Sequence, residues 1–141
     1  IFDVSKEGPL DTVGTVQSAT APAFIEVVDS PAGSPKLAYL VGGGMLQVYD
    51  VSNPSAPAKL STLRIPGRPT RAAVRGKLAF VAAGAEGVQI VDVSTPAEPK
   101  IVGSHKTPNP ARDVAVTDTH VFIAISAGED AGQVLILRQA P

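Results

Sequence analysis

The sequence has no cysteine and no tryptophan among its 141 residues, and only 4% of the residues are aromatic. Without cysteine, the chain has no disulfide framework. The formal net charge is −1, and acidic and basic residues alternate without blocks. The sequence therefore has no basic segment that would attract nucleic acid or an anionic membrane. No apolar run approaches the ~18 residues that span a bilayer. We therefore expect neither nucleic-acid binding nor membrane insertion.

Hydrophobic residues make up 44% of the chain, and 13 glycines and 13 prolines are spread along it. Proline removes a backbone donor and clashes with the preceding helical turn, so this chain cannot contain many long helices. The Val, Ile, Leu and Phe residues occur in short clusters, which argues against disorder. These features predict short strands separated by turns.

A five-residue motif recurs along the chain. Its three copies are Ile1–Ser5, Val48–Ser52 and Ile90–Ser94, and each contains the sequence Asp-Val-Ser. The aspartates lie 47 and 42 positions apart. A second apolar motif occurs once in each unit, at Leu37–Val41, Leu78–Ala82 and His120–Ala124. Self-similarity at a period of about 40 residues is typical of solenoids and propellers.

The copies differ in length only at segments that resemble turns. The spacing between Val28 and Leu37 is five residues longer than the spacing between Val74 and Leu78 in the middle unit. A further insertion of four residues lies within 126–132. Insertions confined to turns are what a repeated β-unit tolerates.

Each unit contains four short apolar runs, which in the middle unit cover about 70–74, 77–83, 88–93 and 100–105. Runs of this length between turn residues are typical of strands. Successive side chains in a strand point to opposite faces, and within 77–83 the residues of both faces are mostly apolar. Both faces of this strand should therefore be covered. Four-stranded units stacked face to face around an axis form a β-propeller. A two-layer sandwich is the alternative, but it does not explain the repeat.

We therefore predict an all-β segment of a β-propeller with about three four-stranded blades. Residues 1–19 are assigned to the end of a preceding blade, 20–66 and 67–107 to two blades, and 108–141 to an incomplete blade. Propellers close with roughly four to eight blades, so this chain alone should not close a ring. Either the residues are a piece of a longer polypeptide, which we favour, or several copies assemble into one ring.

The segments Val48–Pro54 and Val88–Pro96 resemble the LVIVD repeat of bacterial and archaeal propeller proteins. The resemblance covers essentially the whole chain. It implies an extracellular, cell-surface or periplasmic propeller whose activity is generally not defined, and it supplies no catalytic residues. Arg138 stands where the aspartate would be in the last unit, which indicates a divergent or terminal repeat.

The residues that resemble reactive motifs have simpler structural interpretations. Asp and Ser side chains bond to nearby backbone amides and set turns, so the Asp-Val-Ser motif is interpreted as structural. The two histidines, His105 and His120, are not at a metal-ligand spacing. Gly42–Gly44 is not followed by Lys-Ser or Lys-Thr, so it is interpreted as a hairpin turn and not as a phosphate loop. We predict no catalytic residue, no metal site and no cofactor.

Propeller ligands usually meet the loops that enter the innermost strands and the middle hairpins, by analogy with the fold. In this chain these loops carry residues of both charges, which suit a protein or peptide partner; ordinary surface charge is the other interpretation. The residues are Arg68, Arg71, Asn109, Arg112, Asp113, Glu86, Glu129 and Asp130.

Two functions are consistent with the sequence. The first is a non-enzymatic binding or assembly module that mediates protein–protein contacts at the cell surface or in the periplasm, with a protein partner or further blades of the same propeller. The second is a fragment of a propeller enzyme, a hydrolase or a dehydrogenase, whose active site lies in blades not present here. The sequence has only two histidines, and neither lies in a loop next to an innermost strand, which favours the first function.

Overall fold

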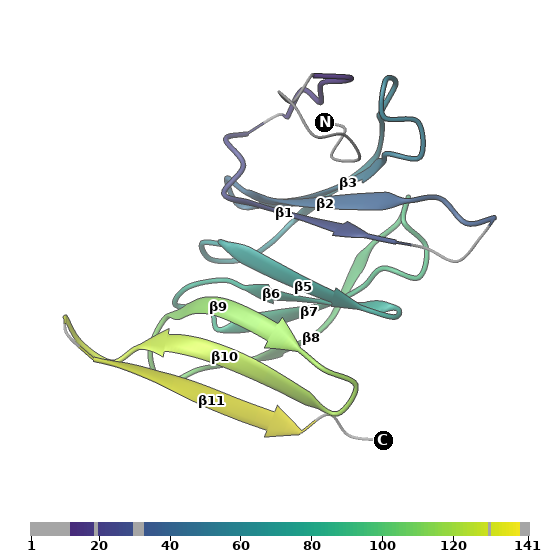
Figure 1. Cartoon of the computed structure of the whole chain (residues 1–141). Helices are drawn as coiled ribbons and strands as arrows, with labels where there is room; N and C mark the ends of the chain where they lie inside the picture. Colours follow the sequence, from purple (N-terminus) through teal and green to yellow (C-terminus); the bar gives the residue numbers. More distant parts are fainter. Residues whose placement is uncertain (1–11, 19, 30–32, 130, 139–141) are drawn as a thin grey trace, which may run out of the picture.

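The computed structural model describes residues 12–18, 20–29, 33–129 and 131–138. Within these residues the chain forms eleven strands and no helix, arranged in three antiparallel sheets, none of which closes into a barrel (Figure 1). The predicted all-β class is therefore confirmed. The first copy of the motif, Ile1–Ser5, lies outside the described residues.

Each sheet is a meander in which the strands follow one another in sequence order. Sheet 1 contains β1 (Phe24–Val28), β2 (Leu37–Gly42), β3 (Met45–Asp50) and β4 (Ala58–Arg64). Sheet 2 contains β5 (Arg71–Arg75), β6 (Leu78–Ala82), β7 (Val88–Asp92) and β8 (Lys100–His105). Sheet 3 contains β9 (Ala111–Val116), β10 (His120–Ser126) and β11 (Gly132–Arg138).

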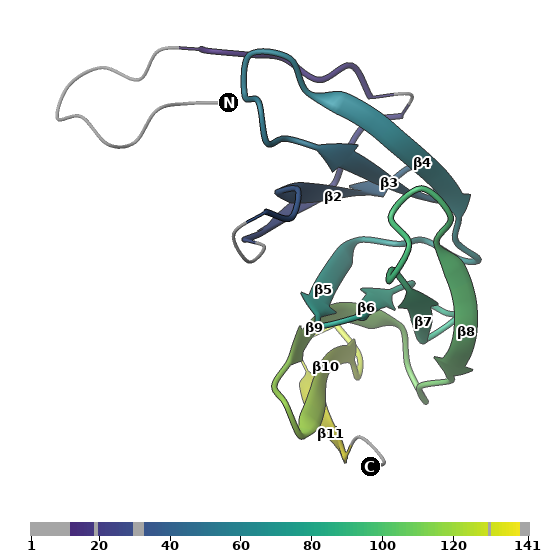
Figure 2. The same ribbon diagram turned by 90° about the vertical axis from the view of Figure 1, so that its right-hand side faces the viewer.

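The three sheets pack face to face and fan out from the side on which their first strands lie (Figures 1 and 2). Strand β1 lies against β5, and β5 lies against β9. Figure 2 shows the last strands, β4 and β8, on the outer side of the arc. This is the arrangement of three propeller blades, with the first strand innermost and the last strand outermost. The arc formed by the described residues is open.

Alternate residues of one strand enter two different cores, because a neighbouring sheet covers each face. In β6, Ala79 and Val81 belong to the core between sheets 1 and 2. Phe80 and Ala82 belong to the core between sheets 2 and 3. The apolar character of both sets of residues is therefore explained by burial on both faces, as the sequence predicts.

One aromatic position is repeated in all three sheets. In each sheet, an aromatic residue pairs with the residue two positions before the motif aspartate, whose place Arg138 takes in sheet 3. The aromatic residues are Tyr39, Phe80 and Phe122. Tyr39 and Phe80 are buried, whereas Phe122 is only half-buried, because none of the other described sheets covers that face of sheet 3. The difference in burial thus reflects the position of each sheet in the arc.

The Asp-Val-Ser motif forms the same turn in sheets 1 and 2. The backbone N–H of Ser52 donates to Asp50 Oδ1 at 2.9 Å, and the N–H of Ser94 donates to Asp92 Oδ1 at 2.8 Å. Hydrogen bonds from the serine hydroxyl and amide hold the pKa of each carboxyl below its ordinary value. The structural interpretation of this motif is therefore confirmed.

The first strand of sheet 1 is offset by one residue from the alignment made on the sequence. Val28 pairs with Leu37, but Arg75, and not Val74, pairs with Leu78. Val28 therefore corresponds to Arg75, and the insertion before Leu37 is six residues instead of five. In a strand, a shift of one residue moves every side chain to the other face.

We expect the substitution Phe80→Ala to lower the free energy of unfolding by about 3–5 kcal/mol, because loss of a buried ring leaves a cavity that packed sheets cannot easily close. Urea melts monitored by circular dichroism measure this change. The matched control is Val102→Ala on an exposed site of β8, where we expect a change within about 0.5 kcal/mol. A loss below about 1 kcal/mol for Phe80→Ala would show that the ring is not part of the core.

The turn carboxylates should make the protein less stable in acid. Because folding lowers their pKa from 3.8, their contribution is present above about pH 4 and is lost as the pH falls through the lowered pKa. A variant with Asp50→Asn and Asp92→Asn keeps an acceptor oxygen but cannot titrate. Urea melts between neutral and acid pH should show a smaller acid-induced loss in this variant than in the wild type. Equal losses, or the same effect in a Glu98→Gln control, would contradict the prediction.

Candidate functional site

The innermost strands bring three side chains from three sheets into one row. Phe24, Arg71 and Asp113 occupy the same register position in β1, β5 and β9. The guanidinium carbon of Arg71 lies 4.2 Å from the centroid of the Phe24 ring, which is a cation–π contact. On its other side, Arg71 Nε lies 2.9 Å from Asp113 Oδ1. We call these three residues the inner-strand row.

A carboxyl group lies next to this row. Glu26 follows Phe24 by two residues on β1, so both side chains are on the same face. Burial raises the pKa of the Glu26 carboxyl, and the positive charge of Arg71 partly opposes this shift. Glu26 therefore places a second, partly desolvated carboxyl close to the same guanidinium.

The row borders a polar pocket of about 310 Å³ on the surface of the inner strands. Its walls come from β1, β5 and β9, and its charged lining residues are Glu26, Arg71 and Arg75. Arg75 is held in place because its Nη2 and Nε lie 2.6 and 2.7 Å from Asp118 Oδ1. The pocket thus has an aromatic wall and charges of both signs.

Of the residues singled out in the sequence, the structure brings Arg71 and Asp113 together in an ion pair. Arg112 donates instead from Nε to Ser126 Oγ at 2.8 Å, and its carbonyl accepts from Thr70 Oγ1 at 3.0 Å. These bonds connect the beginning of β9 with β10 and with the segment that enters β5.

The remaining predicted residues that the structure describes lie separately in the loops. Glu86 forms an ion pair with Lys106 at 3.6 Å, and the carbonyl of Asn109 accepts from Thr107 Oγ1 at 2.6 Å. Arg68 and Glu129 are exposed. Asp130 lies outside the described residues. The described members of this set therefore make separate contacts and do not form one cluster.

Sequence analysis missed Phe24 and Glu26, which line the polar pocket. The alignment matched Val28 with Val74, and this shift of one residue matches Phe24 with Thr70 instead of Arg71. Matching Val28 with Arg75 brings Phe24 into register with Arg71. The long turn before Leu37 concealed this correspondence, because it removed the spacing on which the alignment depended.

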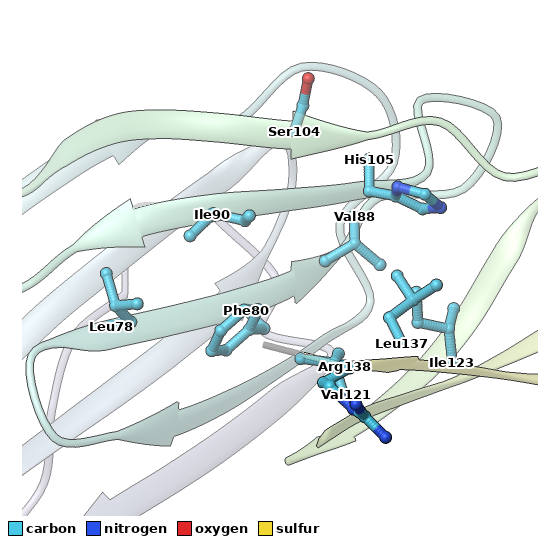
Figure 3. Close-up of a pocket in the computed structure, with 10 residues that line it drawn as sticks. All are labelled: Leu78, Phe80, Val88, Ile90, Ser104, His105, Val121, Ile123, Leu137 and Arg138. Atoms are coloured by element: carbon cyan, nitrogen blue, oxygen red, sulfur yellow. The ribbon is translucent and has the colours of Figure 1, made fainter. Parts of the chain in front are cut away.

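A second pocket, of about 330 Å³, lies between sheets 2 and 3 (Figure 3). Phe80 and Val88 from sheet 2 face Leu137, Ile123 and Val121 from sheet 3, so its walls are mostly apolar. It lies beside β11, the last strand of a three-stranded sheet. We attribute this pocket to the packing of sheets of unequal width and not to a ligand.

No group of three or more potential metal ligands is found in the part of the chain that the structure describes. The same residues include no helix that is long and apolar enough to cross a membrane.

Comparison with known families agrees with the repeat seen in the structure. A family model described as LVIVD repeat matches residues 34–62 and 66–107, which together are just over half of the chain. The first match spans β2, β3 and most of β4, and the second spans all of sheet 2. No curated protein matches the chain.

We expect a double-mutant cycle between Phe24→Leu and Arg71→Ala to give a coupling free energy of about 0.5–1 kcal/mol, as for an exposed cation–π contact. Urea melts of the two single variants, the double variant and the wild type measure it. The control cycle pairs Phe24→Leu with Arg112→Ala, whose effects should be additive. A coupling equal to that of the control would contradict the stacking of Arg71 on Phe24.

Proposed function

Because the chain belongs to the LVIVD-repeat family, we propose that this propeller-type repeat module is non-enzymatic and binds a protein partner through its inner-strand surface. The resemblance to secreted and surface propellers supports an extracellular, cell-surface or periplasmic setting. The observation on which the proposal depends is the inner-strand row of Phe24, Arg71 and Asp113 beside a polar pocket.

The chemistry of this surface is suited to recognition of a polypeptide. Aromatic residues and arginine are the types that contribute most of the binding energy in protein interfaces. Phe24 and Arg71 are stacked before any partner arrives, so little side-chain freedom is lost on binding. Charges of both signs match a partner that also carries both, and such complementarity mainly confers specificity.

The loops extend this surface toward solvent. Arg68 lies just before β5 and Arg112 lies at the start of β9, and both side chains are exposed. Two backbone hydrogen bonds between Gly84 and Ala111 connect the β6–β7 hairpin to the beginning of β9. The two arginines are therefore presented from backbone that is fixed across two sheets.

The proposal is tested by selecting a phage-displayed library of random linear peptides on the immobilised chain. We expect selected peptides to bind the variant Arg71→Ala, and the double variant Arg68→Glu with Arg112→Glu, about tenfold or more weakly than the wild type. The control is the double variant Lys59→Glu with Lys100→Glu, which makes the same charge change on the outer strands β4 and β8.

Binding to the control at the wild-type level, together with loss in the inner-strand variants, would support the proposed surface. If no peptide is enriched, or if the enriched peptides bind all variants equally, the inner-strand surface is not a polypeptide-binding site.

A further inference from the structure

The charged residues of the polar pocket on the inner strands are not equally paired. Arg71 Nε lies 2.9 Å from Asp113 Oδ1, and Arg75 Nη2 lies 2.6 Å from Asp118 Oδ1. Within the residues that the structure describes, the third charged lining residue, Glu26, forms no ion pair of this kind. Each arginine therefore has a carboxylate of its own, and the Glu26 carboxylate lacks a close counterion among these groups.

The surroundings of Glu26 do not compensate its negative charge. Burial raises the pKa of the Glu26 carboxyl, and the opposing effect of the positive charge of Arg71 is the smaller of the two. Asp113 is paired with Arg71 and offsets much of its charge, so little attraction remains for Glu26. A carboxylate that is partly removed from water gains more from a bound cation than a fully hydrated one does.

The residues in register with Glu26 on the neighbouring inner strands are small. Strand pairing shows that Glu26, Ala73 and Ala115 occupy the same position in β1, β5 and β9, which lie side by side (Figure 1). Both alanines line the pocket. Because two of the three side chains in this row are single methyl groups, the row leaves space for a longer side chain beside the Glu26 carboxylate.

The uncharged walls suit the stem of a long cationic side chain. They are formed by small or branched apolar residues of β5 and β9: Ala72, Ala73, Val74, Val114, Ala115 and Val116. Lysine and arginine pack their methylene groups on apolar surface of this kind while the charged end reaches a polar group. The pocket therefore offers both an apolar wall and a carboxylate to such a side chain.

An anionic group fits this pocket less well. It would have to compete with Asp113 for Arg71, or with Asp118 for Arg75, and Arg75 is held through both Nη2 and Nε. It would also be repelled by Glu26. A cation pairs with Glu26 without breaking any of these ion pairs.

We propose, on the basis of the function proposed above, that the polar pocket takes a lysine or arginine side chain of the polypeptide partner, with Glu26 as its counterion. Glu26 is then the residue that determines specificity on this surface. The exposed Arg68 and Arg112 lie just before β5 and near the start of β9 and attract acidic residues of the same partner. The partner segment should therefore carry a basic residue for the pocket and acidic residues for the loop arginines.

The test selects the library of random linear peptides on the immobilised wild-type chain and, in parallel, on the Glu26→Gln chain. Peptides selected on the wild type should be enriched in lysine or arginine relative to the unselected library, and peptides selected on Glu26→Gln should not. Glu26→Gln keeps the size of the side chain and removes only its charge, and circular dichroism melts establish that the variant is folded.

The affinity of the selected peptides gives the size of the effect. We expect Glu26→Gln to bind them about tenfold more weakly than the wild type, because a charge-assisted hydrogen bond is lost. The matched control is Glu98→Gln, which makes the same charge change at an exposed site between β7 and β8 and should bind as the wild type does.

Two further measurements identify the pocket itself. Replacing the basic residue of a selected peptide with norleucine should weaken binding to the wild type by a similar factor, and should have little effect on binding to Glu26→Gln. Ala115→Leu, at an exposed position of β9 that lines the pocket, should also weaken binding, because the larger side chain fills the space without changing the charge.

The outcomes separate this proposal from the function on which it rests. If no peptide is enriched, or if the peptides bind Arg71→Ala as well as the wild type, both fail. If the peptides depend on Arg71 but bind Glu26→Gln and the wild type equally, the inner-strand surface binds polypeptides and the cationic pocket is excluded. A dependence on an acidic peptide residue that is lost in Arg75→Ala would show that the pocket takes an anion, which would also overturn the proposal.

Discussion

Each sheet in this chain has apolar residues on both faces, and each face therefore requires another sheet. In β6, Ala79 and Val81 contribute to one core, and Phe80 and Ala82 contribute to the other. A single neighbouring sheet can therefore bury only half of the apolar side chains of this strand. At about 25 cal/mol for each Å² of apolar surface, exposing a whole face is costly for a domain of marginal stability. Similar sheets therefore stack face to face. The outward faces of the first and last sheets are also apolar, so they too require a covering surface.

The inner-strand row is a second consequence of this stacking. Because successive sheets converge on the side of their first strands, side chains at one register position of β1, β5 and β9 come within reach of each other. Phe24, Arg71 and Asp113 occupy that position, and their types differ although their places are equivalent. The repeated backbone thus supplies the geometry, while the residues that vary between repeats supply the chemistry. This division explains why a repeat that is easy to recognise says little about the ligand.

Most of the architecture could be predicted from the sequence because it depends on periodic features. The recurring Asp-Val-Ser motif aligned β3 with β7, and the apolar motif around Phe80 aligned β2, β6 and β10. The inner strands lack such a motif, and the long turn before Leu37 removed the spacing that would have aligned β1. Contacts between sheets, such as that of Arg71 with Phe24, depend on this register and on side-chain direction, and neither is visible in a single sequence.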